Sequence, residues 1–220
     1  MRSEQIMKFP ALAAAVGFKH TFTLRNPDID VSVDREEALR RLQDWHLEIL
    51  RSEIGIPPSR LVTAEQVHGS RIAVVTNYES GVEKAVDGLI CRDPGIALGI
   101  YVADCCAIYL IDPVSKAFGV LHSGKKGTEQ NITAGAIALM VSNFSVKPEN
   151  LIVQLCPCIR PPAYELDFAA AIREQARLAG VRPENIHDER ICTTSDLSSF
   201  YSYRAEKGKT GRMFALLARA

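Results

Sequence analysis

Apolar residues recur at helical spacing in the first third of this chain. The pattern predicts a helix that begins near Asp34 and ends before Gly55. Asp34 and Glu37 have the spacing of a capping box, which favours a helix start at this point. Apolar positions on one face of this helix are Ala38, Leu42, Trp45 and Ile49. The same period predicts a helix over residues 129–143, and a further one that Asp167 caps and Gly180 closes.

β-rich runs bounded by turn residues fill most of the remaining sequence. We predict strands over residues 18–25, 61–66, 71–76, 86–91, 97–111, 117–122, 151–155 and 213–217. Several of these strands follow one another without an intervening helix. That order favours an α+β fold over a doubly wound parallel sheet.

Composition and charge narrow the class of protein. The 220 residues, of which 47% are hydrophobic, suit one globular domain over residues 1–220. Lys plus Arg equals Asp plus Glu, at 26 each, so no net positive field is available for a nucleic acid or an anionic membrane. No apolar run is long enough to span a bilayer, and the N-terminus lacks the pattern of a secretory signal. We therefore expect a soluble, cytoplasmic protein with small-molecule partners, whereas its oligomeric state stays open.

Three potential metal ligands lie at predicted strand edges. They are His68, Cys105 and His122, and strand edges next to turns are places where side chains from different strands converge. Two imidazoles and a thiolate form a plausible three-ligand zinc site with an open fourth position. Copper is an alternative, although a blue-copper site usually adds an axial Met and none lies in these segments. From residue types alone, a purely structural role for all three remains open.

A thiol enzyme is equally compatible with these residues. Cys105 would then be a nucleophile activated by His122, with Asp104 or Gln66 orienting the pair. The six cysteines form no CxxC pair, so they predict neither a disulfide framework nor a finger-type zinc site.

A glycine- and lysine-rich loop spans residues 119–128, between a predicted strand and a predicted helix. Such a loop presents backbone N–H groups and a helix dipole to an anion, and Lys125 and Lys126 add charge. It is not a Walker A loop, because Lys126 stands where Ser or Thr must bind magnesium. The loop is therefore a predicted site for phosphate or another substrate anion, and solvated surface lysines are the alternative.

Several motifs occur together in an order that resembles the YfiH-type laccase-domain family, and they cover most of the chain. The motifs are Gln66-Val67-His68-Gly69, Asp87-Gly88-Leu89, Ala103-Asp104-Cys105, Asp112-Pro113, the segment from His122 to Thr128, Cys158-Ile159, Tyr164-Glu165, the segment from Phe200 to Arg204, and Thr210-Gly211-Arg212.

This resemblance implies layered mixed β-sheets flanked by helices and a zinc site made by His68, Cys105 and His122. It implies a purine nucleoside phosphorylase that also deaminates adenosine and cleaves methylthioadenosine, with a purine nucleoside and phosphate as partners. The family's older naming implies a copper-dependent polyphenol oxidase instead. If the protein is such a phosphorylase, we expect Asp104, Cys105 and His122 to be catalytic. Expected contacts to substrate or phosphate are Arg25, Gln66 and Lys126.

Three segments depart from the family pattern, one of them Cys156-Pro157-Cys158 in place of a usual Gly-Pro start. The chain has HSGKKG where the family has HAGWRG, so Lys126 keeps the charge of an arginine but loses its planar fork. After Arg25 the chain continues Asn26-Pro27-Asp28 where the family usually has Gly-Gly-Val-Ser. These changes are also compatible with a third hypothesis, in which the protein is a non-catalytic relative that binds a metal.

Overall fold

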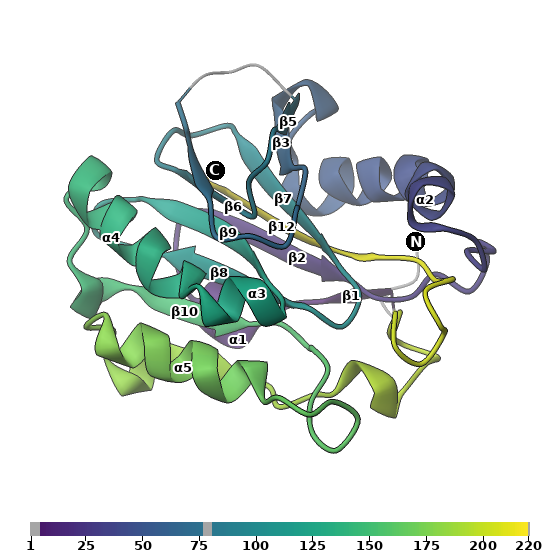
Figure 1. Cartoon of the computed structure of the whole chain (residues 1–220). Coiled ribbons are helices and arrows are strands. Elements are labelled where there is room, and N and C mark those ends of the chain that lie inside the picture. Colours follow the sequence, from purple (N-terminus) through teal and green to yellow (C-terminus); the bar gives the residue numbers. More distant parts are fainter. Residues whose placement is uncertain (1–4, 77–80, 220) are drawn as a thin grey trace.

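Two six-stranded mixed β-sheets are stacked face to face in the computed structural model, which describes residues 5–76 and 81–219 (Figure 1). Sheet A has the strand order β1 (Ile6–Met7), β2 (Phe18–Thr23), β12 (Met213–Arg219), β7 (Ala97–Val102), β3 (Leu61–Ala64) and β5 (Gly81–Glu83). Sheet B has the order β11 (Ile186–Asp188), β10 (Ile152–Leu155), β8 (Cys106–Ile111), β9 (Phe118–Ser123), β6 (Gly88–Cys91) and β4 (Ile72–Val75). Each sheet contains parallel and antiparallel pairs. The predicted α+β class with layered mixed sheets is confirmed.

Strand β8 shows how the layers share a core. Ala107, Tyr109 and Ile111 face the core between the two sheets, where they meet Phe22 and Ala215 of sheet A. The alternate residues of β8 face outward, beneath helices α4 (Ile132–Phe144) and α5 (Phe168–Leu178). Because both faces of this strand are covered, its sequence is apolar throughout and does not alternate.

Helix α2 (Arg35–Ile49) and the helical turn η2 (Leu50–Ile54) cover the other face of sheet A, opposite α4 and α5 (Figure 1). Asp34 caps α2 as predicted, with its carboxylate accepting from the N–H groups of Glu36 and Glu37. The return half of the capping box does not form, because the Glu37 carboxylate is bonded instead to Arg40 and Arg41.

The predicted continuous strand over 97–111 is wrong. The chain leaves sheet A at the end of β7, turns through residues 103–105 and enters sheet B as β8. Asp104 adopts a positive φ of 80° in this turn, a conformation that breaks an extended strand. The crossing from one sheet to the other therefore places Cys105 between them.

The remaining predicted helices and strands occur with shifted ends. The helix predicted over residues 129–143 occurs as α4, and a separate short helix, α3 (Lys125–Glu129), precedes it. Asp167 caps α5 by accepting from the N–H of Ala170. Elements that the sequence pattern did not predict are short: α1 (Pro10–Ala13), β1, β5, β11 and the 3₁₀ turns η3 (Pro58–Arg60), η4 (Pro148–Asn150), η5 (Pro183–Asn185) and η6 (Thr193–Ser195). In the part of the chain that the structure describes, no helix is both long and apolar enough to cross a membrane.

Candidate metal centre and active site

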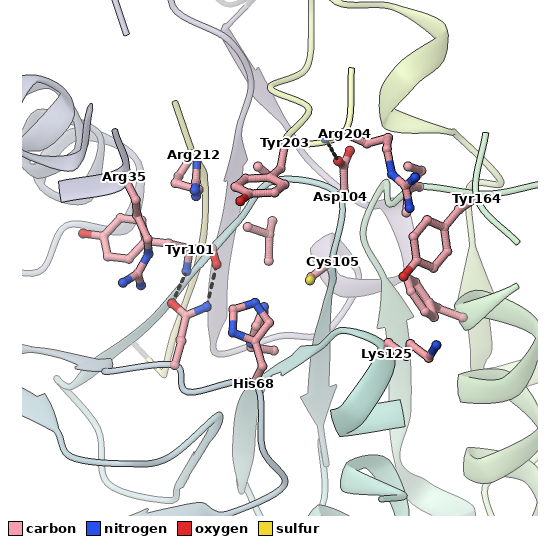
Figure 2. A pocket seen from close by; sticks show the side chains of 16 residues that line it. Arg35, His68, Tyr101, Asp104, Cys105, Lys125, Tyr164, Tyr203, Arg204 and Arg212 are labelled. Atoms are coloured by element: carbon pink, nitrogen blue, oxygen red, sulfur yellow. Dashed lines mark hydrogen bonds between the residues drawn. The ribbon is translucent and has the colours of Figure 1, made fainter. Parts of the chain in front are cut away.

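The three predicted ligands meet at one point between the sheets. The ligand atoms of His68, Cys105 and His122 all lie within 4.8 Å of one another. His68 comes from the loop after β3, Cys105 from the turn between β7 and β8, and His122 from the end of β9. The two imidazole rings lie edge to face, with their centroids 4.8 Å apart, and Figure 2 shows the Cys105 sulfur facing the same space as His68.

A buried carboxylate, Asp87, organises this cluster. One of its oxygens accepts from the backbone N–H of His68 at 2.9 Å and the other from that of Gly69 at 2.7 Å. The first oxygen also lies 2.8 Å from Nδ1 of His122. Asp87 therefore fixes the His68 loop and leaves Nε2 of His122 available to a ligand, as carboxylates behind metal-binding histidines do.

Sequence reasoning gave no role to Asp87. The only available signal was its place in the Asp87-Gly88-Leu89 motif, directly before a strand. Its contact with His122 arises from the pairing of β6 with β9 and is not visible in a linear sequence.

Close approach of the chain at the cluster requires glycine at position 124. A Cβ built there would lie 2.7 Å from the Cys105 sulfur, closer than any real contact of this kind. Any larger residue would push the end of β9 away from the turn that carries Cys105.

Hydrogen bonding within the cluster favours a thiolate on Cys105 and a protonated imidazole on His122. Burial would raise the pKa of the Cys105 thiol, but hydrogen bonds with His122 and His68 lower it to about 6. Burial opposes protonation of His122, whereas its hydrogen bonds with Asp87 and Cys105 raise its pKa to about 9. These shifts favour the thiolate of Cys105, the form in which cysteine binds metal, whereas His122 must release its Nε2 proton when a metal binds.

The donor set fits a metal of intermediate softness. One thiolate and two imidazoles, with room for a further ligand, are typical of catalytic zinc sites and are also found around copper. The site contains the same three residues that the sequence singled out.

Asp104 lies beside the cluster, but its hydrogen bonds go elsewhere. One carboxylate oxygen accepts from the Thr193 hydroxyl at 2.6 Å and the other from the backbone N–H of Arg204 at 2.7 Å. Neither oxygen is hydrogen-bonded to a histidine here, and a catalytic role for Asp104 stays a prediction. Asp104 instead ties the turn that carries Cys105 to two later loops, and it lines the cavity described next.

A cavity of about 680 Å³ opens over the cluster, a volume within the usual range for small-molecule sites. Its lining residues are Arg35, Gln66, His68, Tyr101, Val102, Ala103, Asp104, Cys105, His122, Lys125, Ile159, Tyr164, Phe168, Tyr203, Arg204 and Arg212. Figure 2 shows Arg35, Arg212 and Tyr101 on one side of the cluster, with Lys125, Tyr164 and Arg204 on the other. Cations and aromatic rings therefore flank the candidate metal centre on both sides.

Gln66 lines the cavity, and its amide is bonded to strand β7. The amide nitrogen donates to the carbonyl of Tyr101 at 2.6 Å, and the amide oxygen accepts from the N–H of Tyr101 at 2.9 Å. Gln66 thereby extends the pairing of sheet A and holds Tyr101 in place beside the cavity.

Arg25 and Lys126, the predicted anion contacts, do not line this cavity. The Arg25 guanidinium pairs with Glu206 at 2.6 Å and lies 4.5 Å above the ring centre of Tyr201, so its charge is already neutralised inside the protein. Lys126 follows Lys125 in helix α3, and successive helical residues point in directions about 100° apart. Lys125 reaches the cavity for this reason, whereas Lys126 is exposed outside it. Sequence reasoning missed Arg35, Arg212 and the aromatic lining residues as functional residues, because none stands beside a predicted ligand in the sequence.

A family model described as "Multi-copper polyphenol oxidoreductase laccase" matches residues 30–169 and 164–220 of this chain. The chain belongs to this laccase-domain family. The expected family membership is thereby confirmed. The description of the family model names a copper oxidase.

Curated relatives in the laccase-domain family carry a different name. Purine nucleoside phosphorylase YlmD of Geobacillus stearothermophilus is 28% identical over 91% of this chain and 85% of its own length. Purine nucleoside phosphorylase YfiH of Shigella flexneri is 29% identical over 73% of this chain and 74% of its own length.

Solved structures support the same fold. The crystal structure of YlmD from Geobacillus stearothermophilus matches with a TM-score of 0.85 at 25% identity, and covers 100% of this chain and 97% of that protein. The hypothetical protein YfiH of Bacillus licheniformis matches with a TM-score of 0.83 at 22% identity, and covers 92% of this chain and 93% of that protein. The laccase-domain fold therefore extends over the whole of this chain.

Proposed function

We propose that this protein is a zinc-dependent purine nucleoside phosphorylase. The observation that carries the proposal is the convergence of His68, Cys105 and His122 at the floor of a cavity of about 680 Å³ that aromatic and cationic side chains line. Relatives named purine nucleoside phosphorylase support the choice of substrate class. Adenosine deaminase and methylthioadenosine phosphorylase activities at the same site are part of the proposal.

Zinc is the metal that we favour for this site. His68, Cys105 and His122 would hold it, and when bound it supplies Lewis acidity at the centre of the cavity. Among the lining residues that the structure describes there is no methionine, the usual axial ligand of blue copper.

In phosphorolysis, a phosphate oxygen attacks C1′ of the ribose, the bond from C1′ to the base nitrogen breaks, and the base leaves with the electron pair. The protein must hold both substrates in line and offset the negative charge on the departing base. Tyr101, which stacks on Phe214 at 4.1 Å between ring centres, is a rigid apolar surface beside the cluster. Tyr164 and Phe168 form a second aromatic surface on the wall, with ring centres 4.9 Å apart. Either surface suits a flat purine.

The test is turnover of inosine by the zinc-loaded protein in phosphate buffer. We expect hypoxanthine and ribose 1-phosphate in equal amounts, and about one zinc per chain in protein purified without added metal. The triple variant His68→Ala, Cys105→Ala, His122→Ala should lose both the metal and the turnover. Cys192→Ala removes a thiol outside the cavity and is the matched control. Absence of turnover with zinc fully bound would exclude the phosphorylase proposal.

A copper-dependent polyphenol oxidase is the second candidate, because the matching family model carries that description. Oxidation of phenols by such an enzyme must stop without oxygen, whereas phosphorolysis continues. Parallel assays with a phenol and with inosine, each in air and under anaerobic conditions, therefore separate the two functions.

A further inference from the structure

Two arginines from distant parts of the chain meet at one side of the cavity. Arg35 is the first residue of helix α2, and Arg212 directly precedes strand β12. Both line the cavity beside Tyr101, on the side away from Lys125 (Figure 2). Neither guanidinium group takes part in the hydrogen bonds described above for the metal centre.

Neither arginine of this pair forms a salt bridge in the part of the chain that the structure describes, although Arg212 lies over the Tyr203 ring, 5.8 Å from its centre. Arg212 is 7% exposed, and one of its terminal nitrogens donates to the carbonyls of Thr210 and Gly211, at 2.8 Å each. Arg35 donates only to the carbonyl of Glu65, at 3.4 Å. In residues 5–76 and 81–219, no carboxylate forms an ion pair with either guanidinium.

The arrangement is electrostatically unfavourable by itself. Burial and the nearby charge of Arg35 lower the pKa of Arg212 from its ordinary value, and the opposing influence of Cys105, Tyr203 and Asp104 does not offset them. Because arginine stays protonated in proteins, the protein holds two like charges at the edge of a low-dielectric space. A bound anion would remove both costs.

Three other arginines that are partly shielded from solvent are neutralised. Arg25 pairs with Glu206, and Arg160 and Arg173 share the carboxylate of Asp188. At the other side of the cavity, Arg204 lies 3.7 Å from Glu165 and over the ring of Tyr164. In the described residues, the Arg35–Arg212 pair therefore differs from these arginines in forming no salt bridge.

We infer that Arg35 and Arg212 form the phosphate subsite of this cavity. The inference rests on the proposed function for its choice of anion, and it replaces Arg25 and Lys126 as the phosphate contacts. Guanidinium groups donate in a planar fork that matches two phosphate oxygens, so two adjoining arginines hold a tetrahedral anion more specifically than a lysine does. Phosphate bound here shares the cavity with His68, on the Tyr101 side, and a nucleoside fills the remaining space toward Tyr164.

Phosphate binding without nucleoside tests this subsite directly. We would titrate inorganic phosphate into the zinc-loaded full chain by calorimetry, and compare the wild type with Arg35→Gln and Arg212→Gln. Each substitution should weaken phosphate binding by about tenfold or more, because it removes charge-assisted hydrogen bonds. Arg40→Gln, on the same helix but paired with Glu37 at the surface, is the matched control and should bind as the wild type does.

Arg35 keeps the test decisive if the buried Arg212 variant does not fold, because Arg35 is exposed at the start of its helix. Phosphate affinity unchanged in Arg35→Gln, a loss in Lys125→Gln instead, or no phosphate binding to the wild type would each overturn the inference. The proposed function can fail separately. If phosphate binds through Arg35 and Arg212 but no nucleoside is cleaved, the subsite is supported and the phosphorylase proposal is excluded. With turnover, Arg35→Gln should raise KM for phosphate and leave KM for inosine unchanged.

Discussion

Arg25 and Arg212 carry the same charge, and the fold surrounds them differently. Arg25 donates to Glu206 and to the carbonyl of Phe200, and it stacks on Tyr201. Arg212 is more buried, yet it forms no salt bridge in the described residues: it donates to two carbonyl groups, lies over the Tyr203 ring and feels the like charge of Arg35. A cation that the protein neutralises internally contributes to stability, whereas a cation left without a counterion is available to a ligand.

Histidines show the same contrast. His122 faces the carboxylate of Asp87, and its pKa rises to about 9 even though burial opposes the charge. His20 and His46 are buried without an acidic partner, and burial lowers their pKa values to about 4 and about 3. An internal carboxylate therefore distinguishes the imidazole of the metal centre from the histidines of the core.

The largest expected effect is a loss of stability in acid that comes from His20 and His46. Both pKa values lie below the ordinary 6.5, so between pH 6.5 and about 4 the unfolded chain binds protons that the folded protein excludes. Their contribution is complete above pH 6.5 and is lost as the pH falls. Since each pKa unit corresponds to about 1.4 kcal/mol, we expect a loss of several kcal/mol.

Urea unfolding of metal-free protein at pH 7 and pH 5 measures this loss. His46→Phe, in an aromatic environment of Trp45, Tyr101 and Phe214, should reduce the difference between the two pH values. An equal difference in the wild type and the variant would show that His46 does not contribute.

Arg25→Gln is expected to destabilise the fold by about 1.5–3 kcal/mol, the range for a hydrogen bond to a charged group. Glu206 would lose its partner while still accepting from Ser202 and Thr210. Phosphate affinity should not change, because Arg25 does not line the cavity. Chemical unfolding of this variant measures its stability, and phosphate titration measures its phosphate affinity. Weakened phosphate binding would contradict the contrast between Arg25 and Arg212.

Asp87→Asn should lower the affinity for zinc by about tenfold to a hundredfold, because the carboxylate that orients His122 is replaced by a neutral amide. Competition with a chromophoric chelator gives the affinity. Asp112→Asn changes another buried aspartate, which accepts from Val114 in a turn away from the cavity, and should leave zinc binding intact. Equal zinc affinities for the wild type and Asp87→Asn would show that Asp87 does not contribute to metal binding.

The smallest expected effect is that of Arg35→Gln on stability. Its guanidinium has no carboxylate partner in the described part of the chain, and its removal relieves repulsion with Arg212. We expect a change within about 0.5 kcal/mol, typical of surface positions. Unfolding of Arg35→Gln and Arg25→Gln side by side should give clearly different losses, and a loss for Arg35→Gln as large as that for Arg25→Gln would show a structural role.

Local pattern determined much of this protein. Helical periodicity located α2, α4 and α5, and the chemistry of imidazole and thiolate at strand edges singled out His68, Cys105 and His122. Periodicity and side-chain chemistry are properties of neighbouring residues, so they can be read along the chain. The ordered motifs also indicated the family, which the match over most of the chain then confirmed.

Only the tertiary structure decided how charges are partnered. The break of the predicted strand over 97–111, the contact of Asp87 with His122, and the neutralisation of Arg25 by Glu206 all join segments that are distant in the sequence. The meeting of Arg35 with Arg212 has the same origin. Electrostatic energy depends on distances in space and on burial, and the stacking of the two sheets sets both. The sequence therefore identified the candidate ligands and Lys125, but not the two arginines that lie beside them.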